Sequence, residues 1–393
     1  MPIPRYTTTR WPLFFTLGFR PFFFCAGLWA SGAMALWLLL LWQGVFLPTA
    51  FAPSLWHAHE MLFGFVATAI AGFLLTAIPN WTGRLPLQGA PLAGLFLLWC
   101  AGRIAVAVSA VIGPLAAAAV DLAFLAVLLA VILREILAGR NWRNLPVAAV
   151  VALLLVANAL VHIGAQVHGA LAEGGLRLAV GAIVMLISLI GGRIVPSFTG
   201  NWLRKAGVAV LPESFGAFDR VVLGWSAVAL ASWVVLPTSP LVAWGVGVAG
   251  LLQGLRLARW GGLRTGAEPL VWVLHLGYGW VMLGLLLLAA GTLMPSFSTS
   301  APLHALTTGA MGTMILAVMT RATLGHTGRP LVADGATVAA YVLISLAAVL
   351  RIAAGASALP LRMQIAAGLC WILAFVLFLL RFGPMYFRAR VAA

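Results

Sequence analysis

Two histidines and one glutamate stand at the start of a long apolar segment. His57, His59 and Glu60 precede a run of mostly apolar residues that continues to Pro79. An unpaired polar side chain in hydrocarbon costs several kcal/mol, so ionisable groups in such segments usually mark a site. An α-helix turns by about 100° per residue and therefore directs His57 and His59 about 200° apart. This spacing predicts that the two imidazoles serve two different centres, one on each side of the helix.

Five of the seven histidines are predicted to lie at one level near the outer membrane surface. His57 and His59 begin one apolar segment, His162 and His168 lie at the end of another, and His304 begins a third. Neutral imidazole is a usual axial ligand of b-type haem and a common copper ligand, so these five residues are candidate metal ligands. The alternatives are a hydrogen-bonded packing role for His162 and a headgroup position for the others, which is the preferred interpretation for His168 beside its loop.

Glu60 is the candidate catalytic residue, because a carboxylate next to two histidines can pass protons, orient an imidazole or complete a metal shell. The alternative is an ordinary interfacial acid, which the helix dipole favours near a helix N-terminus. Arg177 is a candidate for bidentate pairing with haem propionates, and a contact with lipid headgroups is its alternative. Arg103 and Asp121 lie equally far from a short outer connection, which predicts a structural ion pair between their helices, with a proton route as the alternative.

The composition places the chain in a lipid bilayer. Of its 393 residues, 63% are hydrophobic and 8% are charged, whereas soluble domains carry about 25% charged residues. The net charge of +15 would suit nucleic acid, but Lys and Arg collect in short connections between apolar segments, as the positive-inside rule requires. We therefore expect no nucleic-acid partner. No Cys-x-x-Cys-His motif occurs in the sequence, which excludes covalently attached haem.

Twelve apolar segments are long enough to cross a bilayer as helices. Basic residues mark alternate connections, which predicts that both termini lie in the cytoplasm. No connection is long enough for a soluble domain, so residues 1–393 are predicted to form a single all-α membrane domain. The predicted spans are residues 19–42, 57–79, 88–110, 115–137, 146–168, 175–196, 218–236, 240–258, 269–291, 303–321, 331–352 and 363–382.

Three of these segments carry a Thr-Gly pair near their inner ends. Aligning the pairs also aligns a glycine earlier in each segment and sets His59 over His304. The pattern predicts three pseudo-repeated four-helix units at about 12–138, 146–260 and 269–382, an arrangement that haem-copper oxidases also have. Chance matches between glycine-containing apolar segments are the alternative. The pairs are Thr82-Gly83, Thr199-Gly200 and Thr327-Gly328, and the glycines are Gly64, Gly181 and Gly309.

Five stretches together form a specific pattern: Gly-Phe-Arg-Pro-Phe-Phe at 18–23, Trp-His-Ala-His-Glu-Met-Leu-Phe-Gly at 56–64, Ala-Ile-Pro-Asn-Trp-Thr-Gly at 77–83, Gly-Arg-Ile-Val-Pro-Ser-Phe-Thr-Gly-Asn at 192–201 and His-Ala-Leu-Thr-Thr-Gly at 304–309. In these stretches the chain resembles the NnrS family over essentially its full length. The resemblance implies a bacterial inner-membrane protein that contains haem and copper and is linked to nitric oxide stress and often to denitrification. The expected cofactors are one or two b-type haems, and copper.

Two classes of function remain open. In the first, the protein is a nitric oxide reductase-like oxidoreductase, with nitric oxide as substrate and quinol as candidate electron donor. His59 and His304 then hold one haem, while His57 holds a second iron or copper centre with help from the histidines of the 146–168 segment, and Glu60 handles protons. In the second, the protein binds or transports haem or metal without redox turnover. Transport is the weaker interpretation, because transporters concentrate ionisable groups near mid-membrane.

Overall fold

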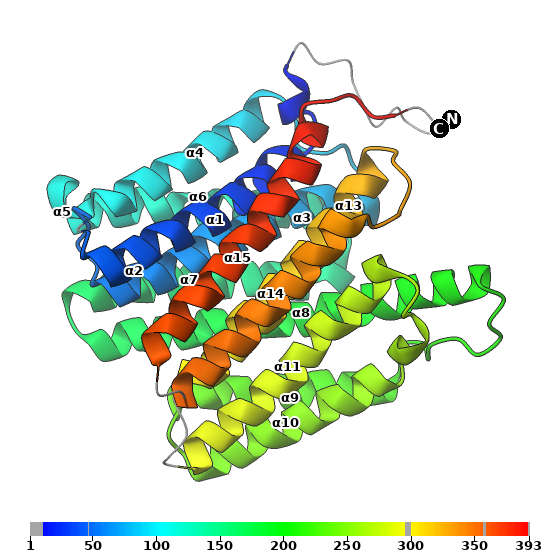
Figure 1. Cartoon of the computed structure of the whole chain (residues 1–393). Coiled ribbons are helices and arrows are strands. Elements are labelled where there is room, and N and C mark those ends of the chain that lie inside the picture. Colours follow the sequence, from blue (N-terminus) through cyan, green and yellow to red (C-terminus); the bar gives the residue numbers. More distant parts are fainter. Residues whose placement is uncertain (1–10, 46, 295–299, 357–358, 392–393) are drawn as a thin grey trace. The chain divides into compact units, whose positions relative to one another are not determined.

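The computed structural model describes residues 11–45, 47–294, 300–356 and 359–391. These residues form helices and connections, and no strand occurs among them. Twelve helices of this described part are long and apolar enough to cross a membrane, which confirms the predicted all-α fold (Figure 1). They are Phe19–Gln43, Pro53–Thr82, Ala90–Ala107, Pro114–Ala138, Trp142–Gln166, Gly169–Lys205, Ala217–Val235, Pro240–Ala258, Pro269–Leu293, Ser300–His326, Gly335–Ala353 and Pro360–Tyr386.

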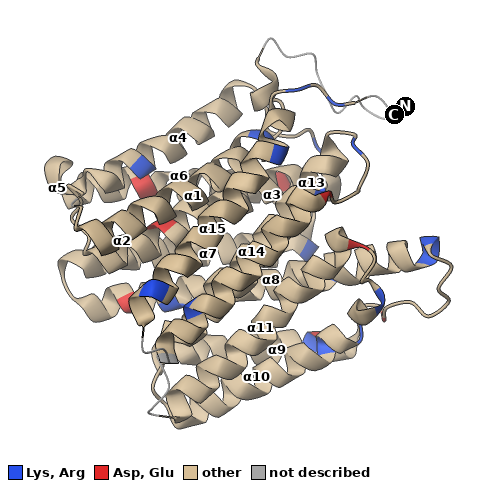
Figure 2. Cartoon of the chain, in the orientation of Figure 1, with Lys and Arg blue, Asp and Glu red and all other residues tan. Residues whose placement is uncertain are grey.

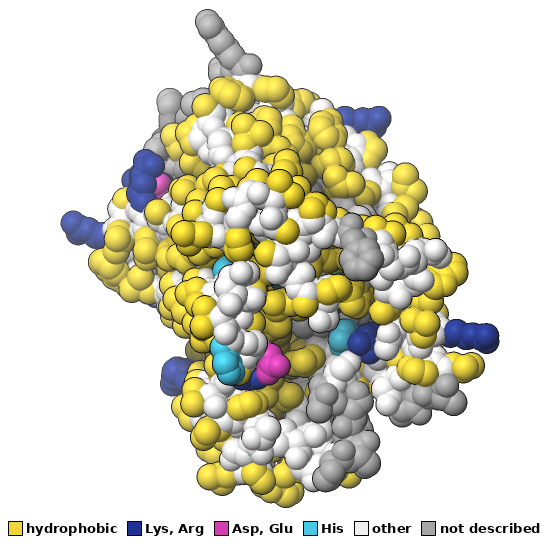
Figure 3. All heavy atoms as spheres, turned by 90° about the vertical axis from the view of Figure 1, so that its left-hand side faces the viewer, with side chains coloured by type: hydrophobic (Ala, Val, Ile, Leu, Met, Phe, Trp, Pro, Cys, Tyr) yellow, Lys and Arg dark blue, Asp and Glu magenta, His cyan; other side chains and the backbone are white. Residues whose placement is uncertain are grey.

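The surface of these helices is largely apolar. Large aliphatic side chains are widely exposed, for example Leu115 at 85% and Leu241 at 81%. Figure 2 shows few charged residues along the helices, and hydrophobic side chains predominate on the face drawn in Figure 3. Such a surface suits contact with lipid rather than water. The chain is therefore a multi-pass membrane protein.

The described chain divides into two compact units. The first comprises residues 1–179, 326–329 and 379–393, and the second comprises residues 180–325 and 330–378. Each unit is described by itself below. The predicted single domain with three four-helix units stays a prediction.

The first unit contains most of the residues considered for the site. Its helices are α1 (Phe19–Gln43), α2 (Pro53–His59), the π-helix η2 (Glu60–Val66), α3 (Ala67–Thr82), α4 (Ala90–Ala107), α5 (Ser109–Ile112), α6 (Pro114–Ala138) and α7 (Leu145–Gln166). Within this unit α1 packs against α3, both α3 and α4 pack against α6, and α6 packs against α7 (Figure 1). The span that holds His59 therefore lies between its neighbours in the interior of the unit, and 78% of its apolar window is buried.

The second unit holds the remaining spans. Its helices are α8 (Gly169–Lys205), α9 (Ala217–Val235), α10 (Pro240–Ala258), α11 (Pro269–Leu293), α12 (Ser300–His304), the π-helix η5 (Ala305–Gly312), α13 (Thr313–His326), α14 (Gly335–Ala353) and α15 (Pro360–Phe382). The first residues of α8, the last residue of α13 and the last residues of α15 belong to the first unit. Here α10 packs against α9 and α11, and η5 packs against α11 and α14. His304 is thus held by a different set of helices from the set that holds His59.

Proline and glycine mark several helix ends. α11 begins at Pro269, whose missing N–H is not needed in a first helical turn, and the Glu268 side chain accepts the backbone N–H of Leu270. α3 ends before Gly83, whose φ of 71° is a left-handed conformation that glycine adopts readily. These ends follow from local sequence alone.

The sixth span is longer than predicted. Its sequence predicts a helix that ends at Pro196, but α8 continues to Lys205. Val195, Thr199 and Leu203 follow one another at helical spacing and are each no more than 1% exposed. This buried stripe continues beyond the proline, and its burial outweighs the single backbone hydrogen bond that Pro196 removes.

Two π-helices interrupt the tenth and the second spans, and the sequence does not predict them. η2 begins directly after His59, and η5 begins directly after His304. In the alignment of Thr-Gly pairs, the first residues of the two π-helices coincide, and Gly83 and Gly328 share left-handed φ angles of 71° and 72°. Gly200 instead lies inside α8. The repeat itself stays a prediction.

Candidate functional site

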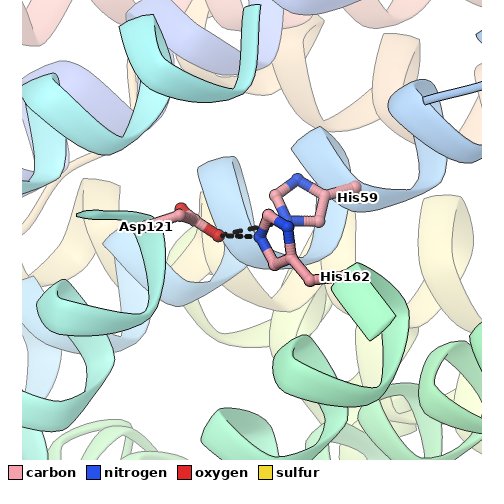
Figure 4. Close-up of side chains that lie close together, drawn as sticks. All are labelled: His59, Asp121 and His162. Atoms are coloured by element: carbon pink, nitrogen blue, oxygen red, sulfur yellow. Dashed lines mark hydrogen bonds and ion pairs between the residues drawn. The ribbon is translucent and has the colours of Figure 1, made fainter. Parts of the chain in front are cut away.

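Three buried side chains from three helices meet in the first unit. His59 at the end of α2, Asp121 on α6 and His162 on α7 form the His–Asp cluster. Asp121 Oδ2 lies 3.2 Å from His59 Nε2 and 3.0 Å from His162 Nε2, and Figure 4 shows the carboxylate directed at both imidazoles. The three side chains are 0%, 1% and 6% exposed. The cluster is therefore closed off from solvent and lipid.

A second layer of polar groups holds this cluster. Arg103 donates to Glu60 Oε1 at 2.7 Å and also pairs with Asp121. This contact confirms the ion pair predicted between Arg103 and Asp121, and Figure 2 shows segments of opposite charge close together on α4 and α6. The formal charges of one guanidinium and two carboxylates lie within one buried network, where removal of any partner leaves a charge uncompensated.

Glu60 and Asn158 orient the individual members. His59 Nδ1 lies 3.0 Å from Glu60 Oε1, and its Nε2 lies 2.9 Å from Asn158 Oδ1. The Asn158 side-chain amide donates to Asp121 Oδ2 at 2.8 Å. Each ring nitrogen of His59 thus has an oxygen partner, which fixes the plane of the imidazole.

Aromatic rings enclose the two imidazoles. The ring centroids of Phe51 and Phe63 lie 5.0 Å and 5.1 Å from that of His59, and Phe51 also lies 5.2 Å from His162. The imidazole rings themselves are 5.2 Å apart at an angle of 78°. These contacts exclude water and lower the local dielectric, so each charge interaction in the network is stronger than it would be in water.

His57 does not belong to the His–Asp cluster. Its ring stacks on Trp37 of α1, with centroids 4.6 Å apart and an interplanar angle of 16°. His57 and His59 therefore face different neighbours, as helical geometry predicts for residues two apart. A metal-binding role for His57 stays a prediction.

His168 and Arg177 also lie outside the cluster. His168 is exposed beyond the end of α7, and its Nδ1 accepts the backbone N–H of Ala170 at 3.3 Å. Arg177 pairs with Glu173 one helical turn earlier, with 3.5 Å between Nη1 and Oε2. Their predicted roles as a metal ligand and a propionate partner stay predictions.

His304 belongs to the second unit. Its Nδ1 lies 2.8 Å from the Ser300 carbonyl oxygen, and Arg351 donates to the Ser300 hydroxyl at 3.1 Å. A carbonyl can only accept, so in the neutral imidazole Nδ1 carries the hydrogen and Nε2 keeps its lone pair, the form in which imidazole binds a metal. A haem shared between His304 and His59 stays a prediction.

Asp121 and Asn158 are the members that sequence reasoning did not assign to the site. The sequence predicts Asp121 as the ion-pair partner of Arg103, with a proton route as the alternative, and not as a metal ligand. The signal that points to it is depth, because Asp121 and His162 each lie six residues inside the predicted outer end of the spans 115–137 and 146–168. Asn158 lies one turn from His162 on the same helix face, which is a second such signal.

The donor set of the cluster fits a transition-metal ion. One nitrogen from each histidine and one Asp121 oxygen lie within 4.8 Å of one another. Imidazole and carboxylate together suit Fe, Cu or Zn ions, and two histidines with one carboxylate leave coordination positions open for a further ligand. The arrangement fits a macrocycle less well at His59, because Phe51, Phe63 and His162 surround that ring.

A family model described as NnrS protein matches residues 13–390, nearly the whole chain. No curated protein matches the chain. The quoted stretches around His57, His59 and His304, the twelve spans and this full-length match agree with one another. The chain belongs to the NnrS family.

Proposed function

We propose that the protein binds a transition-metal ion, copper or iron, at the His–Asp cluster and uses it to handle nitric oxide. Membership of the NnrS family links the chain to the nitric oxide response, and the family is associated with haem and metal binding. The observation that carries the proposal is the convergence of His59, Asp121 and His162 in a buried site. An ion held there would supply a site for nitric oxide to bind and a change of oxidation state. We place the protein in the bacterial inner membrane, with both termini in the cytoplasm.

The surrounding residues prepare the ligands for that ion. Asn158 holds the Asp121 carboxylate, and Glu60 holds the His59 imidazole. Such partners fix ligand orientation and raise ligand basicity. Phe51 and Phe63 keep the site dry, which suits an uncharged diatomic substrate.

The reaction that we favour is reduction. Two molecules of nitric oxide, two electrons and two protons give nitrous oxide and water, so a reductase needs a donor of electrons and a carrier of protons. Glu60 is the candidate proton carrier, because its carboxylate contacts His59, Arg103 and the Trp29 indole N–H. A quinol from the bilayer is the candidate electron donor.

The proposal includes a b-type haem. His304 is the best candidate to hold it, because the hydrogen bond to Ser300 would leave Nε2 free to bind the haem iron. Arg351 next to Ser300 is a candidate partner for a propionate of that haem. Arg177, which lies in the first unit, stays a separate candidate for a propionate contact. His57 remains a candidate ligand of a second haem or copper centre.

Metal analysis and spectroscopy of the purified full chain test these assignments. We expect His59→Ala, Asp121→Asn and His162→Ala each to lose one equivalent of transition metal, while His168→Ala, the matched control in an exposed loop, retains it. Wild-type metal content without any loss in the three variants would refute the site.

A second candidate function is binding of metal or nitric oxide without turnover. The observation that favours it is the closure of the cluster, whose side chains are at most 6% exposed. Steady consumption of nitric oxide by the purified protein with a quinol donor separates the two. Sustained consumption supports a reductase, and a single stoichiometric binding event with intact metal supports a binding protein.

A further inference from the structure

The backbone carbonyl of Gly64 accepts two side-chain hydrogen bonds. Trp99 Nε1 on α4 donates to it at 3.2 Å, and the Thr68 hydroxyl donates to it from the first turn of α3. Gly64 lies within η2, where the Ala67 N–H bonds to the Leu62 carbonyl five residues earlier. π-helices are rare and mostly occur as single turns at functional sites, so one persists where other contacts stabilise it. Trp99 and Thr68 supply such contacts here.

This π-helix coincides with an unusual contact between consecutive residues. On an α-helix neighbouring side chains point about 100° apart and do not face each other. Here His59 Nδ1 and Glu60 Oε1 are 3.0 Å apart, and η2 begins at Glu60. The Glu60 backbone is still α-helical, with its N–H bonded to the Trp56 carbonyl, so the two side chains meet at the N-terminal end of η2, where both join the same network.

Gly64 also makes room for a second indole. Trp29 Nε1 on α1 donates to Glu60 Oε2 at 2.8 Å, and a Cβ atom at Gly64 would lie 2.5 Å from Trp29 Nε1 and 2.9 Å from Glu60 Oε2. The Trp29 and Trp99 rings pack edge to face, with centroids 6.0 Å apart at 84°. Two indoles from different helices therefore contact η2: Trp99 of α4 at the Gly64 carbonyl, and Trp29 of α1 at the Glu60 carboxylate.

We propose that Trp99 and Thr68 are positioning residues that hold η2 in the register in which Glu60 orients His59. The inference rests on the proposed metal site, because the register of η2 would determine the orientation of the ligand His59. Neither residue belongs to the His–Asp cluster, so both act through Gly64 and Glu60. Without the two donors η2 relaxes towards an α-helix, and Glu60 turns away from His59. Loss of a partner that orients a ligand typically weakens metal binding about 10–100-fold.

Substitutions that remove only the donor groups test this role in the full chain. Trp99→Phe keeps a ring without the N–H, and Thr68→Val keeps the shape without the hydroxyl. The chain offers a matched control for each: Trp225→Phe, whose indole donates to the Gly245 carbonyl at 2.9 Å, and Thr76→Val, whose hydroxyl donates to the Gly72 carbonyl at 2.7 Å. Thr68→Ser retains the hydroxyl and should restore wild-type behaviour.

Two readouts separate this inference from the proposed function. The first is hydrogen exchange of the peptide covering residues 59–67 in chelator-treated protein, which needs no metal. The second is the affinity for Co(II) alone and the visible spectrum of the Co(II) form. We expect Trp99→Phe/Thr68→Val to speed exchange in this peptide, to weaken Co(II) binding by at least about 10-fold and to shift the spectrum, while both controls match the wild type.

Unchanged exchange in the double variant would overturn the inference, whatever the metal affinity. Faster exchange with unchanged Co(II) affinity and spectrum would also overturn it, because η2 would then have no influence on the site. If the wild-type chain binds no Co(II), the proposed metal site fails, and the exchange measurement alone decides whether Trp99 and Thr68 hold the π-helix. Circular dichroism checks that every variant remains folded.

Discussion

The buried ion pair between Arg103 and Asp121 should be strongly coupled energetically. Both side chains are at most 4% exposed, and the pair is part of one network with Glu60. Asp121→Asn removes the carboxylate charge while leaving an acceptor of similar shape. Arg103→Gln removes the guanidinium and leaves two carboxylates without a permanent cation beside them. The double variant removes both members of the pair.

The expected magnitudes follow from what each variant leaves behind. Breaking a buried pair by removal of one partner costs about 3–5 kcal/mol. Asp121→Asn should lower the free energy of unfolding by about 3 kcal/mol, because Arg103 retains its 2.7 Å contact with Glu60. Arg103→Gln should lower the free energy of unfolding by about 5 kcal/mol, because two buried carboxylates then repel each other. The double variant should cost about 2–3 kcal/mol less than the sum of the two single variants.

Reversible unfolding in mixed micelles with increasing SDS, followed by circular dichroism, measures all four corners of this cycle. The pair Arg84–Glu135 in the same unit is the control, with Nε 2.5 Å from Oε2 but side chains 40% and 17% exposed. An exposed pair should couple by only about 0.2–1 kcal/mol. A coupling between Arg103 and Asp121 that is no larger than this control would refute our account of the network.

Three further predictions concern the site and the proposed cofactors. Gly64→Ala should destabilise the folded protein and weaken metal binding, since the added Cβ would lie 2.5 Å from Trp29 Nε1; a thermal melt and metal analysis check this, and wild-type values for both would contradict it. His304→Ala should lose the Soret band of a b-type haem while His168→Ala retains it, and optical spectra that do not distinguish the two variants would argue against His304 as the ligand. At a metal concentration of one hundred times Kd, the free energy of unfolding of the wild type should be about 2.7 kcal/mol higher than in protein treated with a chelator. His162→Ala should show no such difference, and an equal difference in this variant would mean that the stabilising metal binds elsewhere.

The spans could be predicted from the sequence because length and helix ends are local properties. A run of apolar residues has to reach across the bilayer, and Pro269 or Gly83 then marks where a helix begins or ends. The prediction was wrong where a local signal competed with packing. Pro196 indicates a helix end, but the buried residues beyond it, including Thr199 and Leu203, carry α8 onward to Lys205.

The π-helices could not be predicted, because the groups that contact η2 come from other helices. Trp99 lies on α4 and Trp29 on α1, and only their approach to Gly64 distinguishes this segment from any other glycine-containing helix. The sequence alignment sets His59 over His304, but it contains no information on the hydrogen-bond register. Register follows from tertiary contacts, which residue spacing does not describe.

For the site, the sequence predicts how deep in the membrane a side chain lies but not which neighbours it faces. Counting residues from a helix end at about 1.5 Å per residue gives the depth of a side chain, and it correctly predicts that Arg103 and Asp121 meet. Depth alone does not distinguish His162, which joins His59 and Asp121, from His57, which stacks on Trp37 instead.

Direction depends on how α2, α6 and α7 are rotated against one another, and small side chains and buried contacts along the whole helix determine that rotation. For this reason the predicted ion pair and the predicted histidine ligands, which the sequence treats as separate features, meet in one network. Asp121 connects them, because one of its carboxylate oxygens faces Arg103 and the other faces both imidazoles. The carboxylate that compensates Arg103 is thus also part of the donor set of the proposed metal site, and neither role can be changed without affecting the other.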